Sequence, residues 1–291
     1  VFRLNLTNDK TLADAKVNPG VADGSVTSLD LASVVCTFKR SSFYLKDSTD
    51  RYYTLSEVKA HAEDISKNEK ASPYWNQYEG YLNDKDGTSY TCQTVWDGTP
   101  YDVRIIGMYH DEKTDGGKAG LTFQFINLLD KPYRMNKKVG DTGCNDGGWG
   151  ASELRANMNP EIDIVSNGVD ENLIWDLVPT DLQDSIVAVQ KAYQPTYNDN
   201  PAIAISNDRL FIASYSEHVE TSHWGASHWS AQEGSQYAYW YNKVTKNYGA
   251  NDLLIKDYQN NTSTDTRWWE RSVSPNNSTN FLVVYTNGGP S

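Results

Sequence analysis

The feature that most constrains this chain is a pair of adjacent tryptophans, Trp268 and Trp269, near its C-terminal end. Glu270 and Arg271 follow them directly, and a second apolar run occupies residues 281–285. Side chains alternate between the two faces of a β-strand, so two neighbouring rings cannot share a face. Either both faces of this strand are covered, or one ring is exposed and free to bind something.

Charge and length exclude several classes of function. The chain has 291 residues and a formal net charge of −12. A nucleic-acid-binding protein needs a basic surface, whereas the lysines and arginines here are dispersed among more numerous acids. No apolar run approaches the roughly 20 residues of a membrane span. We therefore expect no nucleic-acid partner and no membrane insertion by this segment, and we expect any leader or anchor to lie outside it.

Local patterns predict an α+β protein. Thr54 and Glu57 fit a capping box at the start of a helix, and Ser72 before Pro73 fits the start of another. Residues 1–50 are expected to form a β-rich N-terminal segment or a linker from a preceding domain, and residues 51–291 a single module. Further helices are expected from Ser152, over residues 181–190 and from Glu233, and further strands over residues 31–38, 42–45, 101–108, 121–126 and 209–214.

The three cysteines lack the CxxC spacing of a structural zinc site. Their odd number fits one disulfide and one free thiol. Cys36 and Cys92 are the candidate pair, because both lie in strand-like runs, which leaves Cys144 free. Three buried free thiols fit the same pattern equally well.

Calcium binding stays open on the sequence. Asp84 lies in an Asn-Asp-Lys-Asp-Gly segment that is similar to the start of a calcium loop but lacks the distal glutamate. A plain turn is the simpler interpretation, since Asn, Asp and Gly dominate turns. The loops near Asp115 and Asp146 are further places to test.

Catalytic motifs are absent from the sequence, so we predict a protein that is not an enzyme and has no cofactor. There is no nucleophile elbow and no glycine-rich phosphate loop. The spacing of His218, His223 and His228 fits neither a helix face nor a strand, so we interpret them as solvated loop side chains rather than metal ligands.

Two interpretations of the acidic and basic residues beside the tryptophans stay open. Glu270 and Arg271 could be paired inside the protein in a satisfied network, with Glu153 and Arg155 as candidate partners. Alternatively, they could form a carboxylate–arginine ligand site. The network is the simpler interpretation, because it needs no ligand.

An ordered set of motifs adds a resemblance. The set comprises residues 118–123, 133–136, 147–149 with Glu153-Leu154-Arg155, 177–179 with Leu182-Gln183, 208–211, 233–237 and 268–272. It resembles an uncharacterised family of bacterial extracellular modules, found in surface proteins of gut Actinobacteria and Firmicutes and in phage proteins. The resemblance covers residues from about 50 to 291.

The resemblance implies a C-type-lectin-like fold, with a mixed or antiparallel sheet core and flanking helices. Formylglycine-generating-enzyme-like domains and the variable proteins of diversity-generating retroelements are related to it. Trp149, Glu153 and Arg155 would then join the tryptophan strand as a scaffold. Family members continue past the turn at Asn287 to a final apolar strand, which we expect here from a further C-terminal segment or from a strand-donating partner.

The function that these features favour is a non-catalytic binding module on a bacterial surface, of the adhesin type, with a host or microbial glycan or protein as ligand. Short amides, hydroxyls and a tyrosine form an adaptable binding surface. The expected patch comprises Asn276, Asn277, Ser278, Thr279, Tyr285 and Asn287. An ordinary hairpin loop is the simpler interpretation of any one of them. The alternatives are a structural subunit of a pilus tip, surface layer or phage particle, and a glycan-active enzyme with paired carboxylates.

Overall fold

A computed structural model describes residues 42–83, 90–129, 132–137, 143–160, 174–197, 202–219, 233–241, 243–244, 254, 256, 267–274 and 277–289. The chain from Ser41 to Ser291 forms one compact unit. It combines helices with antiparallel strands, which confirms the predicted α+β class. The strand predicted over residues 31–38 lies outside the described residues. No helix within those ranges is long and apolar enough to cross a membrane.

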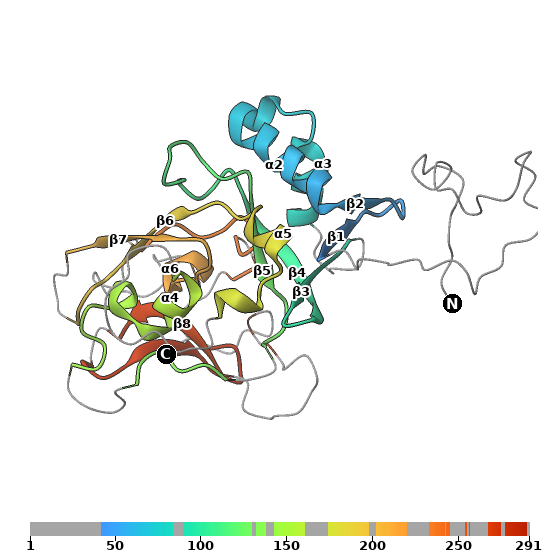
Figure 1. Cartoon of the computed structure of the whole chain (residues 1–291). Coiled ribbons are helices and arrows are strands. Elements are labelled where there is room, and N and C mark those ends of the chain that lie inside the picture. Colours follow the sequence, from blue (N-terminus) through green and yellow to red (C-terminus); the bar gives the residue numbers. More distant parts are fainter. Residues whose placement is uncertain are drawn as a thin grey trace, which may run out of the picture. The chain divides into compact units, whose positions relative to one another are not determined.

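A five-stranded antiparallel sheet in the order β2-β1-β3-β4-β5 forms the first part of this unit (Figure 1). Its strands are β1 (Phe43–Lys46), β2 (Tyr52–Thr54), β3 (Thr91–Trp96), β4 (Thr99–Met108) and β5 (Leu121–Phe125). Asp97 and Gly98 join β3 to β4 with positive φ angles of 49° and 71°, as a two-residue hairpin turn requires. Because β1 lies between β2 and β3, the boundary predicted after residue 50 falls inside the sheet.

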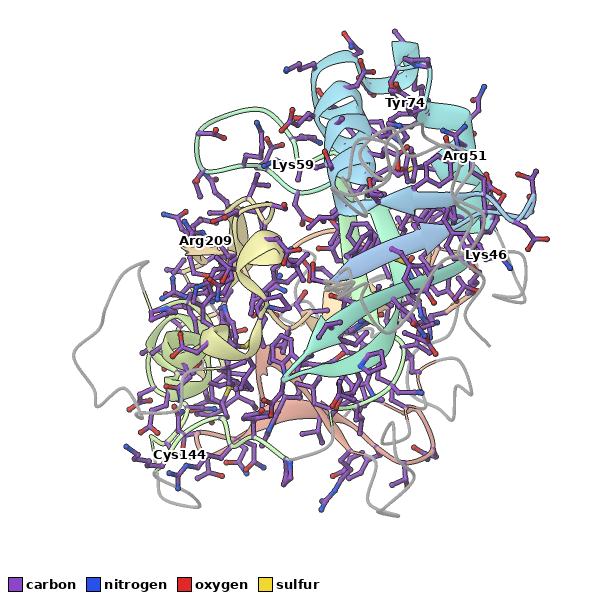
Figure 2. The ribbon with its side chains drawn as sticks, turned by 45° about the vertical axis from the view of Figure 1, so that its right-hand side comes forward. Lys46, Arg51, Lys59, Tyr74, Cys144 and Arg209 are labelled. Atoms are coloured by element: carbon purple, nitrogen blue, oxygen red, sulfur yellow. The ribbon has the colours of Figure 1, made fainter. Side chains whose placement is uncertain are left out.

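Two helices contact this sheet. The helix α2 (Leu55–Asn68) begins with the predicted capping box, in which Thr54 and Glu57 each accept a hydrogen bond from the other's backbone N–H. A short 3₁₀ turn, η1 (Glu69–Ala71), leads to α3 (Trp75–Asn83), which begins two residues after the predicted proline. Figure 2 labels Lys59 on α2. Its ammonium donates a hydrogen bond to the carbonyl of Asp184, far along the chain.

The rest of the unit consists of short elements and two-stranded ladders. They are η2 (Trp149–Ala151), α4 (Glu153–Met158), η3 (Trp175–Leu177), α5 (Thr180–Gln183), β6 (Val189–Tyr193), β7 (Ala204–Asp208), α6 (Tyr215–His218), β8 (Trp268–Val273) and β9 (Phe281–Val284). The strand β6 pairs with β7, and β8 pairs with β9, both antiparallel. The helix predicted after Ser152 is therefore confirmed as α4, and the two C-terminal apolar runs as β8 and β9.

The helix predicted over residues 181–190 is wrong. The helix α5 ends at Gln183, and a strand begins at Val189. The N–H of Gln190 donates to the carbonyl of Glu112 at 2.7 Å, and the strand also pairs with β7. Strand pairing with distant segments thus outweighs a local helical spacing, which is only a weak preference.

Two further local predictions are also wrong. In place of a strand over residues 209–214, the strand β7 ends at Asp208. The side-chain oxygen of Asn159 accepts hydrogen bonds from the N–H groups of both following residues, at 2.7 and 3.1 Å, so these donors cannot join a ladder. In place of a helix from Glu233, the chain forms turns, and Gly234 has a φ of 116° that no helix allows.

The adjacent tryptophans lie on opposite faces of β8, and both are partly buried. Trp268 packs against the core formed by the five-stranded sheet, α2 and α3, and its indole N–H donates to the carbonyl of Leu254. Trp269 packs against a second core around Trp149 and Trp175, and its indole N–H donates to the carbonyl of Tyr133. The strand β8 therefore separates two apolar cores, and its remaining side chains lie deep in the protein.

Candidate functional site

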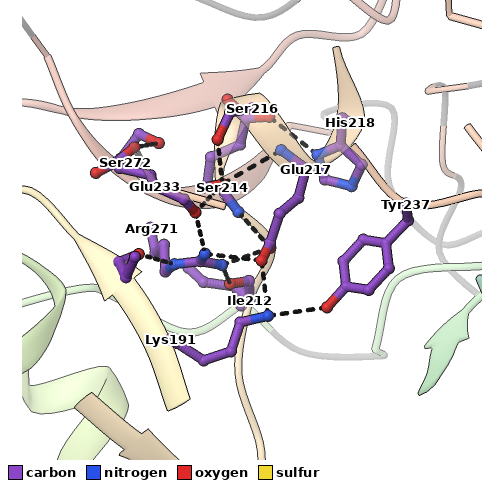
Figure 3. A network of polar contacts seen from close by, with 12 residues as sticks. Lys191, Ile212, Ser214, Ser216, Glu217, His218, Glu233, Tyr237, Arg271 and Ser272 are labelled. Atoms are coloured by element: carbon purple, nitrogen blue, oxygen red, sulfur yellow. Dashed lines mark hydrogen bonds and ion pairs between the residues drawn. The ribbon is translucent and has the colours of Figure 1, made fainter. Parts of the chain in front are cut away.

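Ionisable side chains gather around the middle of β8 and are buried there (Figure 3). Glu270 and Arg271 come from β8 itself, Lys191 from β6, and Glu217 and His218 from α6. Each of these elements is short, so the positions of the side chains depend on contacts between elements rather than within one. Ion pairs join Glu217 to both Arg271 and Lys191, and His218 contacts Glu270.

Arg271 uses all five of its N–H groups. Its two terminal nitrogens donate to the two carboxylate oxygens of Glu217 at 2.6 and 2.9 Å. The other three N–H groups donate to the backbone carbonyls of Ala192, Ile212 and Glu233, at 2.7 to 3.0 Å. A guanidinium has five donors in a fixed planar fork, so this set of acceptors fixes its position fully.

Glu270 and Arg271 are both buried, as the network interpretation expects, and they do not pair with each other, because neighbouring side chains of a strand point to opposite faces. Glu270 instead lies 3.1 Å from His218 Nδ1, and the other ring nitrogen of His218 lies 3.1 Å from the side-chain amide of Gln124. His218 is fully buried, so its predicted place in a solvated loop is wrong too. The two other histidines of that motif lie outside the described residues.

Lys191 is the second buried cation. Its ammonium lies 2.7 Å from Asp111 Oδ1, 2.6 Å from Glu217 Oε1 and 2.9 Å from the hydroxyl of Tyr237. Tyr237 in turn donates its hydroxyl hydrogen to Asp111. The ring of Phe211 covers the ammonium at 4.1 Å from the ring centre. Three acceptors satisfy the three N–H bonds of the ammonium, and the side chain of Lys191 is only 2% exposed.

Burial raises the pKa of a carboxyl group, whereas a neighbouring positive charge lowers it. Burial alone would raise the pKa of Glu217, but the positive charges of Arg271 and Lys191 outweigh burial and hold that pKa well below its usual range. Burial raises the pKa of Glu270 and that of Glu233, which have weaker partners. Glu217 is therefore the fixed negative charge at the centre of the network.

A second buried pair joins Arg155 and Asp208. Arg155 Nε donates to Asp208 Oδ1 at 2.7 Å, while Trp149 Nε1 and Ser206 Oγ both donate to Oδ2. The sequence offers Arg155 as a candidate partner of Glu270, whereas the ion pair that the structure gives for Arg155 is with Asp208. Glu153 is half-buried at the start of α4 and does not join either network through an ion pair in the described part of the chain.

The described residues show neither a set of metal ligands nor the predicted disulfide. Within the described ranges, no three His, Cys, Asp or Glu side chains gather as metal ligands. Asp115 and Asp146 are exposed, and Asp84 lies outside those ranges. Cys92 is buried and bonds to no other cysteine among the described residues, and its proposed partner Cys36 lies outside them, so that pairing stays a prediction.

The predicted binding loop is held down along its backbone. Asn145, which is fully buried, donates its side-chain N–H groups to the carbonyls of Asn277 and Asn280 at 3.0 and 2.8 Å. The N–H of Gly143 donates to the carbonyl of Ser278, and the thiol of Cys144 donates to that of Thr279. Four consecutive loop carbonyls are thus bound by three consecutive residues, 143–145.

The residues of the predicted patch fall into two groups. Asn277, Ser278 and Thr279 precede β9, and Tyr285 and Asn287 follow it. A strand of four residues separates the groups by about 13 Å. Asn277, Tyr285 and Asn287 are exposed, whereas the other two are half-buried. Asn276 lies outside the described residues.

A comparison with protein families finds one match, which covers the C-terminal part of the chain. Residues 125–291 match the family described as "Domain of unknown function (DUF6273)", which is more than half of the chain. The chain belongs to the DUF6273 family. Neither the curated proteins nor the solved structures contain a significant match to it.

The DUF6273 region contains both buried arginines, Arg155 and Arg271, with their acidic partners, and also the whole of the anchored loop. Sequence reasoning missed Glu217 as the partner of Arg271. One local signal could have found it, because Ser214 and Glu217 form a capping box at the start of α6. Lys191 and Asp111 carry no comparable local signal, and Asp111 precedes the DUF6273 region.

Proposed function

We propose that the chain is a non-catalytic binding module of a bacterial surface protein, with an adhesin-type role toward a host or microbial glycan or protein. The observation that carries this proposal is the anchored loop at residues 277–280. A loop whose backbone is already fixed loses little conformational entropy when a ligand binds, so it is suited to recognition. Its free surface offers amide and hydroxyl groups, which suit sugars and polar protein surfaces.

The distribution of charge supports the same proposal. Among the described residues, the buried acidic and basic side chains around Arg155 and Arg271 are held in ion pairs with other side chains of the chain. The C-type-lectin-like architecture belongs to the proposal as well, since it would explain why buried networks support an outer loop that is anchored along its backbone. An extracellular location on the bacterial surface is the setting in which such a module would act.

A binding screen tests the proposal. The purified chain is applied to a glycan array and to a panel of extracellular-matrix proteins. Because the two halves of the predicted patch lie on either side of β9, they are changed separately: Ser278→Arg places a bulky charge on the loop, and Tyr285→Ala removes the exposed ring. We expect the loop variant to lose binding to a ligand that the wild-type chain retains.

Val187→Ala is the matched control, because Val187 is exposed and remote in sequence from the loop. Binding that persists in both patch variants would reject the loop as the recognition site. Absence of any ligand on either panel, combined with turnover of a glycan, would favour the enzyme alternative.

Assembly into a larger particle is the second candidate function. Among the described strands, β9 pairs with β8 alone, so its other edge carries no partner strand from that set. An open strand edge is a template for pairing with another chain. Light scattering over a range of concentrations tests this candidate: concentration-dependent growth in mass supports it, and a strict monomer counts against it.

A further inference from the structure

The contact between Lys191 and Asp111 brings together an amine and a carboxyl group, the two groups from which an amide bond forms. An amine nitrogen lies 2.7 Å from a carboxyl oxygen, and the side chains are only 2% and 3% exposed. The two residues lie 80 positions apart, on β6 and in the connection between β4 and β5. Holding an amine against a carboxyl group in a fixed position gives a very high effective concentration, so a slow bimolecular condensation becomes an intramolecular one.

We propose that Lys191 and Asp111 condense in the folded protein to form an isopeptide bond between Lys191 Nζ and Asp111 Cγ, with release of one water molecule. This covalent link would tie the five-stranded sheet to the DUF6273 region. It is independent of the ligand-binding proposal, because it concerns only the interior of the folded chain.

The neighbouring side chains supply what the reaction needs. Phe211 and Tyr237 place their rings beside the nitrogen, with ring centres 4.1 and 5.2 Å away, and they exclude water. The hydroxyls of Tyr237 and Thr122 both donate to the carboxyl oxygens of Asp111, at 2.6 to 3.0 Å. Donors in these positions stabilise the negative oxygen that develops when a carboxyl carbon is attacked. The Tyr237 hydroxyl also lies 2.9 Å from the nitrogen, so it is placed to relay a proton from the nitrogen to a carboxyl oxygen.

The proposed steps balance in atoms and charge. A proton passes from the Lys191 ammonium to the Asp111 carboxylate, which leaves an amine and a carboxylic acid. The amine attacks Cγ, and the electron pair of the C=O bond moves to the oxygen. The hydroxyl of Tyr237 accepts the second proton from the nitrogen and gives its own proton to the hydroxyl oxygen of Asp111. The C–O bond then breaks, the C=O bond re-forms, and the products are an amide and one water.

Electrostatics select Asp111 rather than Glu217 as the carboxyl that reacts. Before condensation the centre holds two cations, Lys191 and Arg271, and two carboxylates, Asp111 and Glu217 (Figure 3 shows three of these, Lys191, Glu217 and Arg271). Condensation with Asp111 removes one charge of each sign and leaves the Arg271–Glu217 pair intact. Condensation with Glu217 would leave the guanidinium without its two-oxygen partner, and buried unpaired charge is strongly unfavourable.

The intact mass of the purified, reduced and denatured chain tests the proposal. The expected mass is the sequence mass minus one water. A mass equal to the sequence mass would overturn the proposal and establish an ordinary ion pair. Lys191→Arg is the matched variant, since it keeps the positive charge but replaces the amine by a guanidinium. We expect its mass to equal its own sequence mass.

Peptide mapping separates the cross-link from other dehydrations. Trypsin should not cleave after Lys191 in the wild-type chain, and one cross-linked peptide should contain both residue 111 and residue 191. Asp111→Asn should form the same amide with loss of ammonia rather than water. A mass loss that maps to a single linear peptide, or that persists in Lys191→Arg, would reject the assignment.

Discussion

Arg271 and Glu217 form a two-pronged ion pair, with nitrogen–oxygen distances of 2.6 and 2.9 Å and neither side chain more than 2% exposed. Such a pair gives geometric specificity as well as attraction, because the planar fork fits only one arrangement of the carboxylate. It joins β8, which carries the tryptophans, to α6. The guanidinium of Arg271 also donates to backbone carbonyls of three other segments, at Ala192, Ile212 and Glu233. The pair thus connects parts of the chain that no local pattern joins.

The first prediction concerns the charge of Glu217. Glu217→Gln keeps the shape of the side chain but removes the negative charge between Arg271 and Lys191. Breaking a buried pair by removing one partner costs about 3–5 kcal/mol, so we expect the free energy of unfolding to fall by that order. Denaturant unfolding measures the change.

Glu112→Gln is the matched control for this prediction, because Glu112 forms an exposed ion pair with Lys118 at 3.6 Å. Exposed pairs contribute little, so this variant should unfold like the wild-type chain. Equal stabilities for both variants would show that the buried charge does not hold the fold together.

The second prediction concerns pH and Glu233. Burial raises the pKa of Glu233 above its ordinary value of 4.5. The folded state therefore holds a proton that the unfolded state releases, over the pH range between 4.5 and the raised pKa. The contribution of Glu233 to the free energy of unfolding is fully present below pH 4.5 and is lost as the pH rises through the raised pKa of Glu233. Glu233→Gln removes this dependence.

The measurement is the free energy of unfolding of both proteins at a series of pH values. The difference, variant minus wild type, should increase as the pH rises above 4.5 and then level off. Glu217, whose pKa is lowered, has the opposite dependence and loses its contribution as the pH falls below 4.5. It is common to both proteins and cancels in the difference. Parallel curves across the range would contradict the assignment to Glu233.

Sequence patterns predicted the features that depend on neighbours along the chain. The capping box at Thr54 is local, because both its partners lie within one helical turn. The tryptophan strand is recognisable because alternation is a property of the strand itself. By contrast, Glu217 lies 54 positions before Arg271, so nothing near either residue marks the other as its partner.

The wrong local predictions share one physical cause. At residues 189–193 and 209–210, backbone N–H groups bond to distant acceptors, Glu112, β7 and Asn159, and these bonds override the local spacing. The anchored loop could be foreseen only in part. Its exposed amides are visible in the sequence, whereas the residues that bind its carbonyls lie more than 130 positions earlier.

The third prediction tests how closely α2 packs on the sheet. A Cβ atom added to Gly120 would lie 1.9 Å from the backbone oxygen of Ala62, in the middle of α2. A backbone atom cannot move aside like a flexible side chain, so the helix itself would have to shift. Overpacking of this kind costs about 1–3 kcal/mol or more.

We therefore expect Gly120→Ala to lower the midpoint of thermal unfolding, whereas Val187→Ala, a change at an exposed position, should leave it unchanged. An unaltered midpoint for Gly120→Ala would show that α2 does not lie as close to β5 as the structure has it.

The last prediction concerns the anchor of the loop. Asn145→Asp replaces the amide that donates to the carbonyls of Asn277 and Asn280 by a carboxylate oxygen, which cannot donate. Loss of these buried bonds costs about 1–3 kcal/mol, and it also releases the loop. Hydrogen exchange measured by mass spectrometry should quicken in peptides covering residues 274–284 and stay unchanged over α2. Asn287→Ala is the control, because the side-chain oxygen of Asn287 accepts a hydrogen bond from the N–H of Gly289, beyond β9, and its loss should change exchange at that turn rather than in the loop. If Asn145→Asp leaves exchange in the loop unaltered, the loop does not owe its order to Asn145, and the basis for a preformed recognition surface falls with it.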